Sequence, residues 1–80
     1  MAAVVKWLGH GAFEIKTGDH TILLDPFLTD NPQAIVTADS LAADTILITH
    51  GHFDHVSDAA AIANRTGATI IAPVETASWF

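Results

Sequence analysis

Two short runs of consecutive apolar residues, 22–24 and 46–48, constrain the fold of this chain most strongly. In each run large aliphatic side chains stand next to one another, and a polar residue, Asp25 or Thr49, follows. Because neighbouring side chains of a strand point to opposite faces, such runs predict strands covered on both faces, as in a parallel sheet. Both runs are far shorter than the ~20 residues of a membrane-spanning helix.

The remaining pattern predicts an α/β fold with a mixed sheet and one main helix. Strands are expected over residues 3–8, 12–16, 21–25, 45–49 and 68–72. The main helix is expected over 58–65, with Ser57 as its N-cap and Gly67 as its C-cap. One helix cannot cover both faces of such a sheet. We therefore expect residues 1–80 to form a partial domain, the N-terminal segment of a larger fold.

Composition excludes several functional classes. Nine acidic residues against three basic ones give a net charge of −6, which weighs against a nucleic-acid partner. The absence of cysteine removes disulfides and thiolate metal sites, and it favours a cytoplasmic setting. No targeting segment is expected, because the first residues lack a basic region before an apolar stretch. Half of the residues are apolar, so the chain is expected to form a core.

The segment after the second apolar strand carries most of the chemistry. His50 and His52 lie two positions apart, so extended backbone directs both imidazoles to one side. Asp54 and His55 follow at the turn into the helix, where the chain can bring them back to the same place. Neutral imidazoles and a carboxylate are good ligands for zinc, manganese or iron. The pattern predicts a divalent metal site at the carboxyl end of this strand.

The spacing H-x-H-x-D-H after a strand resembles the signature of the metallo-β-lactamase superfamily, whose members fold as an αββα sandwich. Residues 8–13, 24–27, 31–32 and 44–50 are similar to a branch of uncharacterised metal-dependent hydrolases grouped with the ascorbate-6-phosphate lactonases. The resemblance covers nearly the whole chain. It implies that residues 1–80 are the N-terminal half of such a sandwich, with three later ligands of the family beyond them.

The resemblance also implies a ligand set for two divalent metal ions, with zinc preferred and manganese or iron as alternatives. His50 and His52 would hold one ion, and Asp54 and His55 would hold the other. Asp54 would also orient the attacking water, which makes it the expected catalytic residue. These roles follow from the family motif and not from the spacing alone.

Two further residues are placed near the metal site by the resemblance. Asp25 ends the first apolar strand and would support the ligands by hydrogen bonding, the alternative being a residue that only terminates its strand. His10 stands between two glycines after the first strand, and it is expected beside the site or, alternatively, as a polar turn residue.

The expected function is that of a metal-dependent hydrolase in which a dinuclear centre activates water to cleave a small-molecule ester, lactone or phosphoester. Since four candidate ligands would have to serve two ions, we expect the 80-residue chain alone to be inactive, and its open sheet to favour oligomers. A nuclease of the same superfamily and a non-catalytic metal-binding module, with all four ligands on one ion, are the alternatives. A flavodiiron-type redox member is disfavoured, because its motif resembles this one except for an acidic residue at the position of His52.

Overall fold

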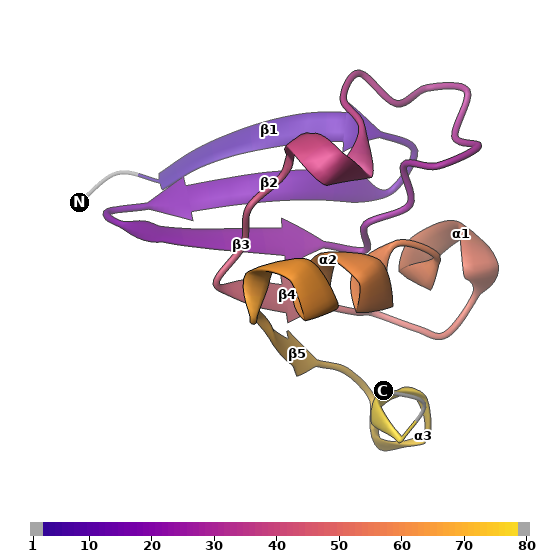
Figure 1. Ribbon diagram of the computed structural model, residues 1–80. Coiled ribbons are helices and arrows are strands. Elements are labelled where there is room, and N and C mark those ends of the chain that lie inside the picture. Colours follow the sequence, from indigo (N-terminus) through magenta and orange to yellow (C-terminus); the bar gives the residue numbers. More distant parts are fainter. Residues whose placement is uncertain (1–2, 79–80) are drawn as a thin grey trace.

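The computed structural model describes residues 3–78, with the side chains of Phe53 and Asp54 excepted. A sheet in the order β1-β2-β3-β4-β5 forms its centre (Figure 1). The strands are β1 (Ala3–Gly9), β2 (Ala12–Thr17), β3 (His20–Leu24), β4 (Thr45–Leu47) and β5 (Thr69–Ile71). The first three strands pair antiparallel, whereas β3, β4 and β5 run parallel. The predicted mixed sheet is confirmed, with small shifts at the strand ends.

One main helix packs on this sheet, as predicted. The helices are η1 (Ala38–Ser40), α1 (Phe53–Val56), α2 (Ala59–Thr66) and α3 (Val74–Ala77). The longest, α2, lies over β3 and β4 in the ribbon view (Figure 1). Its residues Ala59 and Ile62 are buried in the same core as Leu23 of β3 and Ile46 of β4. None of the helices within residues 3–78 has the length and apolar character that crossing a bilayer requires.

Burial differs between the two faces of the sheet. Leu23 and Ile46 are paired neighbours on the face under α2, and both are fully buried. The next row, Leu24, Leu47 and Ile71, points to the opposite face, where Ile71 is 55% exposed and the other two are half-buried. Among the described residues the helix α2 covers one face of the sheet, and the cover of the second face that the two apolar runs predict stays a prediction.

The main helix begins later than predicted. Asp58, and not Ser57, is its N-cap, and the Asp58 side chain makes no capping hydrogen bond. The Asp58 carboxylate is directed instead to the loop after β3, where it accepts hydrogen bonds from the backbone N–H groups of Leu28 and Thr29 at 2.6 and 2.8 Å. The predicted C-cap is confirmed, since Gly67 has a φ of 77° and its N–H donates to the helix at 2.8 Å.

Candidate metal centre

The polar residues of the candidate site lie where two parallel strands end. Asp25 follows β3 directly, and Thr49 and His50 follow β4. Since β3 and β4 are parallel neighbours, their carboxyl ends meet at one edge of the sheet. A hydrogen bond of 2.9 Å from the Asp25 N–H to the carbonyl of Leu47 joins the two ends. His55 reaches the same edge from α1.

Asp25 is the buried centre of this arrangement. Its exposed fraction is 3%, and its φ of 45° lies in the left-handed region, which aspartate tolerates better than most residues. Oδ1 accepts the backbone N–H of Thr49 at 2.7 Å. Oδ2 lies 2.6 Å from the Thr49 hydroxyl and 2.9 Å from Nδ1 of His55. The carboxylate therefore holds together the segment after β4 and the short helix α1.

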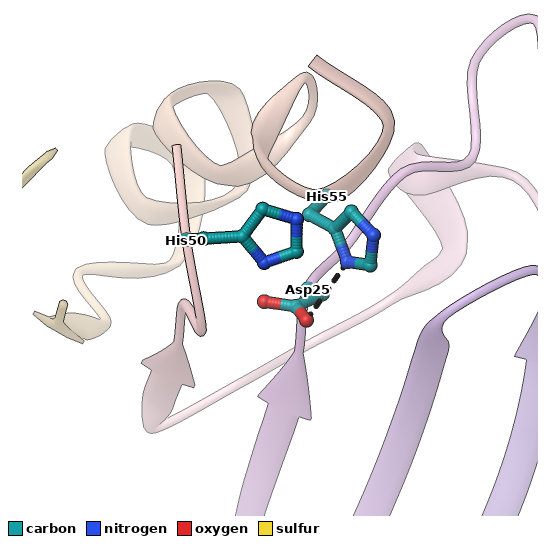
Figure 2. Close-up of side chains that lie close together, drawn as sticks. All are labelled: Asp25, His50 and His55. Carbon is teal, nitrogen blue, oxygen red and sulfur yellow. Dashed lines mark hydrogen bonds and ion pairs between the residues drawn. The ribbon is translucent and has the colours of Figure 1, made fainter. Parts of the chain in front are cut away.

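Asp25, His50 and His55 converge on one point (Figure 2). Each of the three offers a candidate ligand atom, and these atoms all lie within 4.8 Å of one another. The ring centroids of His50 and His55 are 4.1 Å apart, and both residues are half-buried. Such a set of two imidazoles and one carboxylate can hold a divalent ion.

The other two residues of the predicted ligand set differ in what the structure describes. His52 is exposed, and its ring lies at a right angle to that of His50 with centroids 4.6 Å apart. The two imidazoles are thus adjacent, as the two-residue spacing predicts. The side chain of Asp54 lies outside the described residues, so its place as a ligand and as the catalytic residue stays a prediction.

His10 borders the cluster from the turn between β1 and β2. Its φ is 53°, its N–H donates to Oε1 of Gln33 at 3.1 Å, and its carbonyl accepts Nε1–H of Trp7 at 2.8 Å. The residue is exposed, and its ring centroid lies 5.5 Å from that of His55 and 6.0 Å from that of Phe27. His10 therefore lies next to His55, and its role at the metal site stays a prediction.

Close packing around His55 explains the glycine after His10. A Cβ atom built on Gly11 would lie 2.7 Å from Cε1 of His55, which is closer than real Cβ atoms come to other atoms. Any larger residue at this position must displace the imidazole. The turn therefore forms one wall of the site.

Two polar residues near the site were missed in the sequence. Thr49 bridges Asp25 and His50, and its only signal was its place directly before the motif. Asp58 is 7% exposed and anchors the loop that follows Asp25; its signal was a carboxylate in an otherwise apolar helix start, which a helix dipole explains equally well.

Comparison with known proteins agrees with this geometry. The sequence profile of the Metallo-beta-lactamase superfamily matches residues 5–80. The chain belongs to this superfamily. It is similar to UPF0173 metal-dependent hydrolases of Shouchella clausii, at 51% identity, and of Thermococcus onnurineus, at 55%. Each alignment runs over 75 residues and covers 94% of this chain and 33% of the relative.

A solved structure supports the same assignment of fold. It is that of a metallo hydrolase from the archaeon Ignicoccus hospitalis, with a TM-score of 0.78 and 35% sequence identity, covering 85% of this chain and 30% of that one. The chain spans about a third of the length of the relatives it matches. Its mixed sheet and α2 thus correspond to part of a metallo-β-lactamase fold, as the resemblance implied.

Proposed function

We propose that this chain contributes ligands to the catalytic centre of a metal-dependent hydrolase. The observation that carries the proposal is the convergence of Asp25, His50 and His55, whose candidate ligand atoms lie within 4.8 Å of one another. The ends of β3 and β4 and the helix α1 bring these three residues together, so their meeting is a property of the fold. The similarity to proteins named metal-dependent hydrolases supports the reaction class.

The donors fit a divalent ion of intermediate softness. Imidazole and carboxylate groups suit zinc, with manganese or iron as alternatives. In both His50 and His55 the Nδ1 atom is engaged inside the protein, by Thr49 and by Asp25 respectively, which makes Nε2 the atom that can face an ion. When bound, such an ion supplies a Lewis acid that polarises a carbonyl or phosphoryl oxygen and makes water acidic enough to react at neutral pH.

The proposed ligand roles follow the family motif. His50 and His52 hold one ion, and Asp54 and His55 hold a second. Asp54 also orients the attacking water, as a carboxylate beside two cations can. The adjacency of the His50 and His52 rings supports the first pair, and the contact of the His50 and His55 rings supports two neighbouring ions.

Asp25 and His10 have supporting roles in this proposal. The Asp25 carboxylate already accepts two hydrogen bonds from Thr49 and one from His55, so it acts by orienting those groups. His10 presents an exposed imidazole next to His55 and lines the approach to the site.

We propose a small-molecule ester, lactone or phosphoester as the substrate, and the cytoplasm as the setting. The net charge of −6 and three basic residues disfavour a nucleic acid on this part of the protein. The acidic surface also attracts divalent cations to the site. Specificity lies in loops, which the fold alone does not determine.

A metal titration and a chimera test the proposal together. Zinc is titrated calorimetrically into the 80-residue chain and into the variants His50→Ala and His20→Ala. We expect His50→Ala to lose zinc binding. His20→Ala should retain it, because His20 lies at the opposite end of β3 from the site. In the chimera this chain replaces the matching segment of the Thermococcus onnurineus relative. We expect it to hydrolyse model esters, lactones or phosphodiesters, and His50→Ala to abolish that turnover.

Three results would contradict the proposal or replace it. Zinc binding that persists in His50→Ala would show that His50 is not a ligand and would contradict the proposed site. A tight one-to-one zinc complex of the chain, with an inactive chimera, would favour the non-catalytic metal-binding module. Cleavage of RNA by the chimera, without turnover of small substrates, would favour a nuclease.

A further inference from the structure

We propose that the Thr49 hydroxyl positions His50 for metal binding by fixing which nitrogen of the imidazole carries the proton. The inference rests on the proposed metal site and deepens it. Thr49 Oγ1 lies 2.6 Å from Oδ2 of Asp25 and 2.9 Å from Nδ1 of His50, so the hydroxyl stands between a carboxylate and an imidazole. Thr49 is a positioning residue, because it acts through His50.

The place of the hydroxyl proton follows from what each neighbour can accept. A carboxylate has only acceptor atoms, so the short contact with Asp25 requires Thr49 to donate. A hydroxyl has a single proton, and after that donation only its lone pairs remain. The contact with His50 is therefore a hydrogen bond in which Nδ1–H donates to Thr49 Oγ1.

This direction of bonding selects one tautomer of neutral His50. With the proton on Nδ1, Nε2 carries the lone pair that a metal ligand needs. The same rule applies to His55 without an intermediary, because its Nδ1 lies 2.9 Å from Asp25 Oδ2 and must donate to that oxygen. The buried Asp25 carboxylate thus orients His55 directly, and it orients His50 through the hydroxyl of Thr49.

Asp25 also holds Thr49 itself. The backbone N–H of Thr49 donates to Oδ1 at 2.7 Å and its hydroxyl donates to Oδ2, so the carboxylate accepts hydrogen bonds from both the backbone and the side chain of Thr49. Thr49 is exposed, so replacing its hydroxyl by a methyl group opens no cavity in the core. Packing therefore does not require a hydroxyl at this position, and the relay to His50 does.

The tautomer of His50 is the readout that a merely structural role would not move. The metal-free chain with ¹⁵N-labelled histidine is studied by NMR at a pH of about 8, where an ordinary imidazole is neutral. We expect His50 to carry its proton on Nδ1 in the unsubstituted chain. In Thr49→Val it should change toward the mixture of tautomers of an unrestrained imidazole, and zinc affinity measured by calorimetry should fall by about tenfold.

Two further variants complete the test. Thr49→Ser keeps the hydroxyl and should restore both the tautomer and the affinity. Thr45→Val is the matched control, because it removes a hydroxyl that lies 3.0 Å from Nε2 of His20, away from the site; it should change neither.

The inference is overturned if Thr49→Val keeps the tautomer and zinc affinity of the unsubstituted chain, or if Thr49→Ser behaves like Thr49→Val. A chain that binds no zinc contradicts the proposed function instead. In that case the metal-free tautomer comparison still decides whether Thr49 fixes the proton on His50. The two failures are therefore distinguishable.

Discussion

Removing the carboxylate of Asp58 should destabilise this chain more than any other change of an acidic side chain outside the metal site. The side chain is 7% exposed, and it accepts the N–H groups of Leu28 and Thr29 at 2.6 and 2.8 Å and the Thr29 hydroxyl at 2.8 Å. Its own N–H donates to the carbonyl of Pro26 at 3.1 Å. The start of α2 is thus tied to the loop that follows Asp25.

The magnitude follows from these contacts. Hydrogen bonds to a charged group contribute about 1.5–3 kcal/mol each, and part of this is offset by the cost of burying the carboxylate. Asp58→Ala also leaves the buried N–H of Leu28 without its acceptor, so we expect a loss of about 3–5 kcal/mol. A domain of this size has a total stability of about 4–12 kcal/mol, so the variant should lose a large share of it.

Urea unfolding followed by tryptophan fluorescence measures the effect. Asp39→Ala is the matched control, since it removes an exposed carboxylate of η1 and should change stability by less than about 0.5 kcal/mol. If Asp58→Ala does not fold, Asp58→Asn, which keeps one acceptor oxygen, supplies an intermediate value. A stability of Asp58→Ala within about 1 kcal/mol of the unsubstituted chain would refute the reasoning.

Two other substitutions test the site and the core. Gly11→Ala should lower zinc affinity by about tenfold, because the new Cβ would lie 2.7 Å from Cε1 of His55. Gly67→Ala is its control, because a Cβ at Gly67 would have no neighbour within 4 Å. Since Gly67 has a φ of 77°, this control should lower the free energy of unfolding by about 1 kcal/mol and leave zinc affinity unchanged. Equal zinc affinities in the two glycine variants would contradict the placement of His55. Ile46→Ala, at 0% exposure, should cost about 2–5 kcal/mol in urea unfolding, whereas Ile71→Ala, at 55% exposure, should cost less than about 1 kcal/mol. Similar costs at the two isoleucines would show that the second face of the sheet is covered.

The strands could be predicted from the sequence because their signal is local. Runs 22–24 and 46–48 contain apolar residues at consecutive positions; residues 22–24 lie in β3 and residues 46–47 in β4, which pair parallel. Which face of the sheet is covered could not be predicted in this way. Leu23 and Leu24 are the same residue type, and only the position of α2 makes one buried and the other half-buried.

The approach of the candidate ligands to one another was predictable where strand geometry decides it. Two-residue spacing places the rings of His50 and His52 next to each other, and the carboxyl ends of neighbouring parallel strands bring Asp25 next to Thr49. The hydrogen bonds that orient these groups were not predictable. Thr49 and Asp58 are polar residues with partners more than twenty positions away, and no local pattern reveals such partners.

Zinc titration of the ¹⁵N-histidine-labelled chain tests the central claim most directly, namely that the cluster at the ends of β3 and β4 binds a divalent ion. We expect the Nε2 resonances of His50 and His55 to change on zinc binding, because Nδ1 of each ring is engaged within the protein and Nε2 is the proposed ligand atom. His20, which bonds to Thr45 through Nε2 at the opposite end of β3, should keep its resonances. Saturating zinc that leaves His50 and His55 unchanged, or that shifts only His20, would contradict the account.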